Sequence, residues 1–165
     1  MTGDACFPSP LDARHSTLVI TKLLIAWFLM ALCVMVHAIG LMWALRRIHR
    51  SPAPADPRFW PPTWLLIRIA GWLIFLHLIE ISLWALLYAW RQAMPDLHAA
   101  FYFSAVTYTT TGYGDLVLPE AWRLVGGIEA LTGILMCGLS TGFFFAVVNN
   151  MYHMYHPRHP ETTGN

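Results

Sequence analysis

Three long apolar runs, separated by short polar segments, dominate the pattern along the 165-residue chain. The first has no formal charge from Leu23 to Leu45, the second covers Trp64 to Trp90, and the third covers Arg123 to Val148. Each run is long enough for a helix that crosses a bilayer, which needs roughly 20 residues. The pattern therefore predicts an all-α membrane protein with three transmembrane helices.

A shorter helix is expected between the second and third runs. Arg91 and Pro95 end the second run, and Asp96 follows them. Because Asp is a favoured N-cap residue, it predicts a helix over 97–109. That helix is too short to cross a bilayer, so we expect a re-entrant pore helix, followed by a loop over 110–114.

These elements predict the organisation of the whole chain. We expect a polar tail over 1–16, a first transmembrane helix over 17–46, a Pro- and Arg-rich connector over 47–63, a membrane module over 64–148 and a C-terminal tail over 149–165. Within the module, an outer helix covers 64–91 and an inner helix covers 122–148. No cleavable signal peptide is expected, because the first apolar run is too long and is followed by arginines.

Charge predicts the orientation in the membrane. Arg46, Arg47, Arg50 and Arg58 form the densest basic cluster, at the connector. Cytoplasmic loops carry an excess of Lys and Arg, so the connector and the C-terminus should be cytoplasmic, with the N-terminus and the short loop outside. The net charge of +1 gives no indication of nucleic-acid binding.

The polar stretch from Tyr108 to Asp115 is the strongest candidate site. It reads Tyr-Thr-Thr-Thr-Gly-Tyr-Gly-Asp, and its glycines allow positive φ at alternate positions at little steric cost. Alternating handedness turns successive carbonyls the same way, and such a row can replace the hydration shell of an ion. We expect Thr110, Thr111, Gly112 and Tyr113 to coordinate the ion, with the Thr110 hydroxyl as an additional oxygen.

The segment from Thr110 to Asp115 resembles the potassium-channel signature, Thr-x-Gly-Tyr-Gly followed by Asp or Asn. Residues 98–148 are similar to the pore module of potassium channels, as in prokaryotic two-helix channels. The additional first span resembles a group of small bacterial ion-channel proteins. The resemblance implies a passive, potassium-selective channel in the cell (inner) membrane. It also implies that the protein is not an enzyme and has no cofactor, with K⁺ as its permeant ligand.

A cyclic homotetramer is the expected assembly. Non-helical backbone at membrane depth cannot face lipid, and each chain supplies one filter strand, so copies of the chain must close the ring. Membrane lipids are the other expected partners. Neither nucleic acid nor a soluble regulatory domain is expected.

Further residues acquire roles from the resemblance. Gly114, Asp115 and Tyr102 are expected to support the filter, with a Tyr102–Asp115 hydrogen bond, because Val106 stands where many prokaryotic channels carry a glutamate. Gly133 and Gly138 fall where inner helices have hinges, although small residues also permit close helix packing. Helical spacing places Ile134, Cys137 and Thr141 on one face, which is expected to line the cavity.

Ionisable groups in the apolar runs leave two interpretations. Glu80 and Glu129 are costly within a membrane and either sense protons or belong to structural networks with His37, His77 or backbone; we favour the networks. His98, at the start of the pore helix, is either a sensor of external pH or an ordinary interface histidine. His153, His156 and His159 have a loose metal-binding spacing that Pro157 interrupts.

Two other functions remain as alternatives. A weakly selective cation channel is disfavoured by Tyr113, and a non-conducting or partner-dependent subunit of a potassium-uptake system is disfavoured by the single pore repeat. The stimulus that opens the channel is not indicated by any motif. Acidity, membrane tension, lipid and constitutive opening are all compatible with the sequence.

Overall fold

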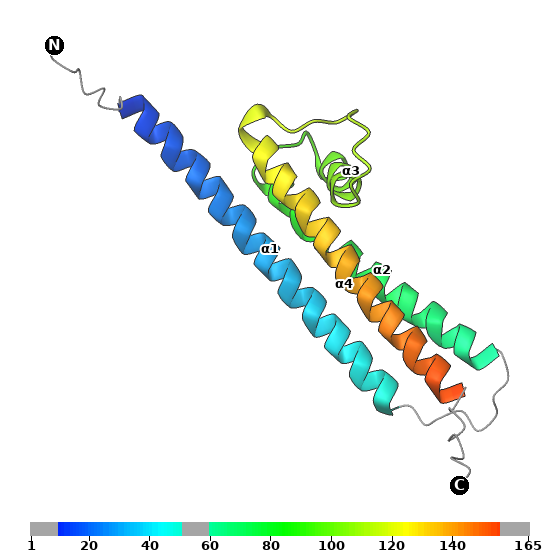
Figure 1. The fold of residues 1–165 in the computed structure, drawn as a ribbon. Helices are drawn as coiled ribbons and strands as arrows, with labels where there is room; N and C mark the ends of the chain where they lie inside the picture. The colour runs from blue at the N-terminus through cyan, green and yellow to red at the C-terminus, as the bar shows by residue number, and fades with distance from the viewer. Residues whose placement is uncertain (1–9, 51–59, 156–165) are drawn as a thin grey trace, which may run out of the picture. The chain divides into compact units, whose positions relative to one another are not determined.

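The computed structural model describes residues 10–50 and 60–155, and all regular structure in these residues is helical (Figure 1). The elements are α1 (Pro10–Arg50), α2 (Trp60–Trp90), α3 (Leu97–Tyr108), the short 3₁₀ helix η1 (Glu120–Trp122) and α4 (Arg123–Tyr155). Within these described residues, three segments are long and apolar enough to cross a bilayer: Ser16–Ile48, Thr63–Trp90 and Glu120–His153. The predicted all-α fold with three membrane-length helices is confirmed.

The long helices extend beyond the apolar runs that predicted them. α1 begins at Pro10 rather than near residue 17, and α4 continues to Tyr155 rather than ending near residue 148. A proline is tolerated in the first turn of a helix, and polar residues alone do not stop one. The parts of the expected tails and connector in 1–9, 51–59 and 156–165, including His156 and His159, lie outside the described residues.

The chain divides into two compact units. Unit 1 contains residues 1–34 and 81–134, and unit 2 contains residues 35–80 and 135–165. The short helix α3 and the loop that follows it therefore belong to unit 1, together with the first turns of α4.

Unit 1 is organised around a buried carboxylate on α4. The Glu129 side chain is fully buried, accepts a 2.7 Å hydrogen bond from the Tyr88 hydroxyl and also accepts one from Ser104. The Ser104 hydroxyl lies 3.0 Å from the carbonyl oxygen of Ile81. The Phe103 ring packs edge-on against Tyr88. Glu129 therefore links α2, α3 and α4 through hydrogen bonds, which lower the cost of burying it.

Replacing Tyr88 with phenylalanine should destabilise the protein. Tyr88→Phe keeps the ring contact but removes a donor from Glu129, and leaving a buried acceptor short of a partner costs about 1–3 kcal/mol. We expect a lower thermal unfolding temperature in detergent micelles. The matched control is Tyr152→Phe, at a position 60% exposed, and an equal decrease in both variants would contradict the proposed importance of the Glu129 contact.

Unit 2 joins parts of α1, α2 and α4. Its apolar cluster contains the buried residues Ile69, Leu73, Val147 and Met151. At Gly40, a Cβ would lie 2.5 Å from the Leu76 side chain, so α1 and α2 approach closely there.

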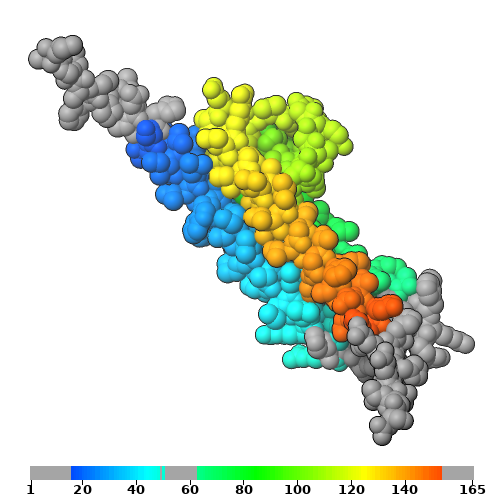
Figure 2. All heavy atoms as spheres, viewed as in Figure 1, coloured from blue at the N-terminus to red at the C-terminus, as the bar shows by residue number. Residues whose placement is uncertain are grey.

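Many apolar side chains remain exposed on the single chain. The atoms of α4, yellow to orange in Figure 2, are uncovered over much of that view, and its exposed residues include Leu131, Leu135, Leu139 and Phe145. Exposed apolar surface of this extent indicates contact with membrane or with other chains.

Candidate ion-conducting site

The short helix α3 is fixed at its N-terminus by its cap. Asp96 is in an extended conformation, and its side chain accepts a 2.7 Å hydrogen bond from the amide of Ala99. The helix has 12 residues, which corresponds to about 18 Å. This length is well short of the roughly 30 Å hydrocarbon core of a bilayer.

The backbone donors after α3 turn back towards its last turn. The amide of Thr110 donates to the carbonyl oxygen of Thr107 at 2.9 Å. The amides of Thr111 and Gly112 both donate to the carbonyl oxygen of Val106, at 2.9 and 3.1 Å. The loop is therefore held through its N–H groups, which leaves its C=O groups available.

The loop backbone alternates in handedness. Thr110, Gly112 and Gly114 have positive φ values of 60°, 52° and 77°. Among the described residues, none donates a hydrogen bond to the carbonyl oxygens from Thr110 to Tyr113. These residues are exposed, and Tyr113 is 71% exposed. A row of carbonyls without donors can bind a cation in place of its water.

Side-chain hydrogen bonds support both ends of the loop. Thr109 donates to the carbonyl oxygen of Ala105 at 2.7 Å, and its hydroxyl lies 3.0 Å from that of Thr111. At the far end, the Tyr102 hydroxyl donates to Oδ2 of Asp115 at 2.8 Å, which is the pairing expected from the sequence. This hydrogen bond to Asp115 raises the pKa of Tyr102.

A double-mutant cycle should show coupling between Tyr102 and Asp115. Tyr102→Phe and Asp115→Ala should each shorten the time over which ion flux is sustained. The double variant should be little worse than either single variant, because both substitutions remove the same hydrogen bond. Fully additive effects on the flux time course would contradict this coupling.

The Tyr102–Asp115 hydrogen bond should also depend on pH. Since the raised pKa of Tyr102 favours its protonated form, which is the donor, the bond should persist at neutral pH. It should be lost as pH rises through that pKa, above about 10.

Gly133 brings α4 against the end of α3. A Cβ on Gly133 would lie 1.9 Å from the carbonyl oxygen of Tyr108, whereas one on Gly138 would meet nothing within 4 Å. Gly133 thus permits a close approach of two backbones. α4 is continuous through both glycines, and a hinge at either remains a prediction.

The other predicted site residues lie on α2, α3 and α4. Ile134, Cys137 and Thr141 are exposed on α4, and the Thr141 hydroxyl donates to the carbonyl oxygen of Cys137 at 2.8 Å. His98 is exposed at the start of α3. Glu80 is fully buried and pairs with His37. Cavity lining and proton sensing remain predictions for these residues.

Sequence reasoning did not identify the hydroxyl partners of the buried groups. Ser104 and Tyr88 bind Glu129, and Ser140 contacts two histidines. No local sequence pattern pairs these residues, because they come from different helices. The only signal was the carboxylate itself, which needs partners inside an apolar segment.

An exposed loop between two bilayer-length helices, with a row of carbonyls that accept no hydrogen bond from the described residues, gives a membrane protein a surface that can bind a cation. Sequence comparison identifies the family. Residues 64–150, just over half of the chain, match the family described as "Ion channel". The chain belongs to that family, which comprises channels rather than enzymes.

Curated relatives match about half of the chain. The potassium voltage-gated channel protein Shal of Drosophila melanogaster is 35% identical over 94 residues, covering 52% of this chain and 16% of Shal. The potassium voltage-gated channel protein shk-1 of Caenorhabditis elegans is 38% identical over 90 residues, covering 50% of this chain and 16% of shk-1. Human potassium voltage-gated channel subfamily A member 6 is 30% identical over 97 residues, covering 54% of this chain and 18% of the human protein. The chain therefore spans less than a fifth of these relatives, and no solved structure matches it.

Proposed function

We propose that this protein conducts potassium ions passively and selectively across a membrane, through a filter made of the carbonyl oxygens of Thr110, Thr111, Gly112 and Tyr113. The observation that carries the proposal is the alternation of positive φ at Thr110, Gly112 and Gly114, which leaves carbonyls without hydrogen-bond donors. Similarity to potassium voltage-gated channel proteins supports potassium as the ion.

A homotetramer would complete the site. One chain provides a single filter strand, exposed on its own, and four copies around an axis would enclose the ion with carbonyls on all sides. The exposed apolar residues of α4 supply surface for contact with neighbouring copies. Ile134, Cys137 and Thr141 would then face the cavity below the filter.

In the proposed orientation, the filter lies on the outer side of the membrane and the basic end of α1 lies on the cytoplasmic side. Arg46, Arg47 and Arg50 at the end of α1 favour the cytoplasmic side. α1 would be a span added before a two-helix pore, as in small bacterial channels of the cell membrane. α3 would direct its C-terminal end, with its partial negative charge, towards cations in the cavity.

A flux assay tests the proposal directly. Purified protein in liposomes should pass K⁺ much faster than Na⁺, and empty liposomes should pass neither. Equal rates for the two ions would instead indicate a weakly selective cation channel. No flux from a well-folded tetramer would indicate a subunit that needs a partner.

A further inference from the structure

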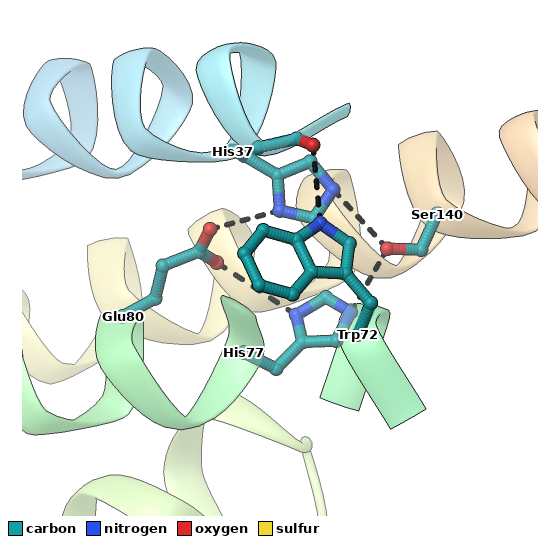
Figure 3. Close-up of polar contacts among 6 residues, drawn as sticks. His37, Trp72, His77, Glu80 and Ser140 are labelled. Atoms are coloured by element: carbon teal, nitrogen blue, oxygen red, sulfur yellow. Dashed lines mark hydrogen bonds and ion pairs between the residues drawn. The ribbon is translucent and has the colours of Figure 1, made fainter. Parts of the chain in front are cut away.

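A cluster of ionisable side chains in unit 2 includes none of the loop residues that we propose to coordinate potassium. His37 of α1 is fully buried, and its Nδ1 lies 2.8 Å from Oε1 of Glu80 on α2. His77, one turn before Glu80, places its Nδ1 3.7 Å from Oε2 of the same carboxylate. Figure 3 shows both imidazole rings directed at Glu80 from two helices.

From this cluster, we propose that His37, His77 and Glu80 bind a divalent transition-metal ion such as Zn²⁺. One ligand atom from each residue lies within 4.8 Å of the others. Neighbouring ligand atoms around tetrahedral zinc are about 3.3 Å apart, given bonds of about 2.0–2.1 Å. The distances from His37 Nδ1 to Oε1 and from His77 Nδ1 to Oε2 of Glu80, 2.8 and 3.7 Å, lie on either side of that value, so side-chain movement without a change of backbone would form the site.

The set of ligands suits zinc rather than magnesium or calcium. Two imidazoles and one carboxylate form a known zinc ligand set that leaves a fourth position open, whereas Mg²⁺ and Ca²⁺ prefer oxygen ligands. Glu80 is three positions after His77 on one helix, so their side chains share a face. Metal sites in helix bundles use the same spacing.

Ser140 of α4 positions both rings. Its Oγ lies 3.1 Å from Nε2 of His37 and 3.0 Å from Nε2 of His77. A hydroxyl oxygen can accept from both Nε2–H groups, which would leave each Nδ1 free of hydrogen and directed at the metal. Metal-binding histidines usually donate their other ring N–H in this way.

The surroundings make the site both rigid and accessible. Three positions after His37, Gly40 permits tight α1–α2 packing, and the Trp72 indole donates to the Gly40 carbonyl oxygen at 3.1 Å. A groove of about 380 Å³ in the surface of unit 2 reaches the cluster, and its lining includes His77, Cys137 and Ser140. The His77 side chain is 18% exposed, which gives an ion a route to the ligands.

Metal binding to the purified full chain tests this site without requiring ion conduction. The protein should carry no histidine tag, and His153, His156 and His159 should be alanine so that tail histidines do not contribute. After chelator treatment, we expect about one Zn²⁺ per chain, and Co²⁺ should give the intense visible bands of four- or five-coordinate cobalt. The spectrum of octahedral aqueous Co²⁺, or no binding, would overturn the proposal.

Substitutions then assign the ligands. Glu80→Gln and His37→Ala should each lower Zn²⁺ affinity more than about 100-fold, and Ser140→Ala, a positioning residue, about 10- to 100-fold. His98→Ala, at an exposed histidine, should leave affinity unchanged. Zn²⁺, but not Mg²⁺, should raise the unfolding temperature of the protein with the cluster intact, which keeps the test decisive if a variant fails to fold. Equal affinities in all variants would exclude this site.

Discussion

Gly112→Ala should abolish potassium selectivity, with the K⁺ to Na⁺ flux ratio falling to about 1. Gly112 has a φ of +52°, and a residue with a Cβ pays about 1–2 kcal/mol in this conformation. In the proposed tetramer the cost arises four times around one pore. The loop would relax towards negative φ, and the carbonyl of Gly112 would rotate away from its neighbours in the row.

The expected defect is local, so the protein should still insert and assemble. Size-exclusion chromatography and liposome flux on the same preparation separate the two properties. Gly71→Ala provides a matched control, because a Cβ at Gly71 meets nothing within 4 Å and its φ is not positive. Unaltered selectivity in Gly112→Ala would exclude the carbonyl row as the filter.

Gly133→Ala should destabilise the fold itself. Its Cβ would lie 1.9 Å from the Tyr108 carbonyl oxygen and 2.7 Å from the carbonyl carbon. Because both atoms are backbone, no side-chain rotation relieves the contact. α4 and the end of α3 must separate by about 1.5 Å to reach ordinary contact distances of roughly 3.5 Å. We expect a loss of about 3 kcal/mol or more per chain.

Thermal unfolding and flux should both change in Gly133→Ala, because the end of α3 carries the loop. Gly138→Ala is the matched control on the same helix, since a Cβ there meets nothing within 4 Å and alanine favours a helix. It should unfold at the same or a higher temperature. If it also reduces channel opening, Gly138 acts as a hinge, whereas equal stability losses in both variants would contradict the packing account.

The sequence predicted the helices well because their signal is local. Apolar length identified three membrane-length helices, and Asp96 located the start of α3, since an N-cap acts on residues immediately after it. Gly112 and Gly114 indicated the alternating loop for the same reason. The ends of α1 and α4 were less predictable. The length of an apolar run reflects the thickness of the membrane, whereas a helix can continue beyond the membrane through polar residues.

Contacts between helices could be predicted only in part. The sequence offered His37 and His77 as partners for the buried carboxylates, and Glu80 does pair with both. The partners of Glu129 were not identified, because its pairing with Ser104 depends on helix rotation and packing. Gly133 similarly indicated a hinge or close packing, and only the position of Tyr108 shows the packing.

The hydrogen bonds of Glu129 have a consequence for biogenesis. α4 leaves the ribosome after α2 and α3, and an acidic residue within an isolated membrane helix opposes the insertion of that helix into the membrane. Tyr88 and Ser104 precede Glu129 in the chain and are already synthesised when it enters the membrane. We therefore expect α2 and α3 to assist the insertion of α4. The insertion of α4 and the folding of the loop between α3 and α4 should then occur together.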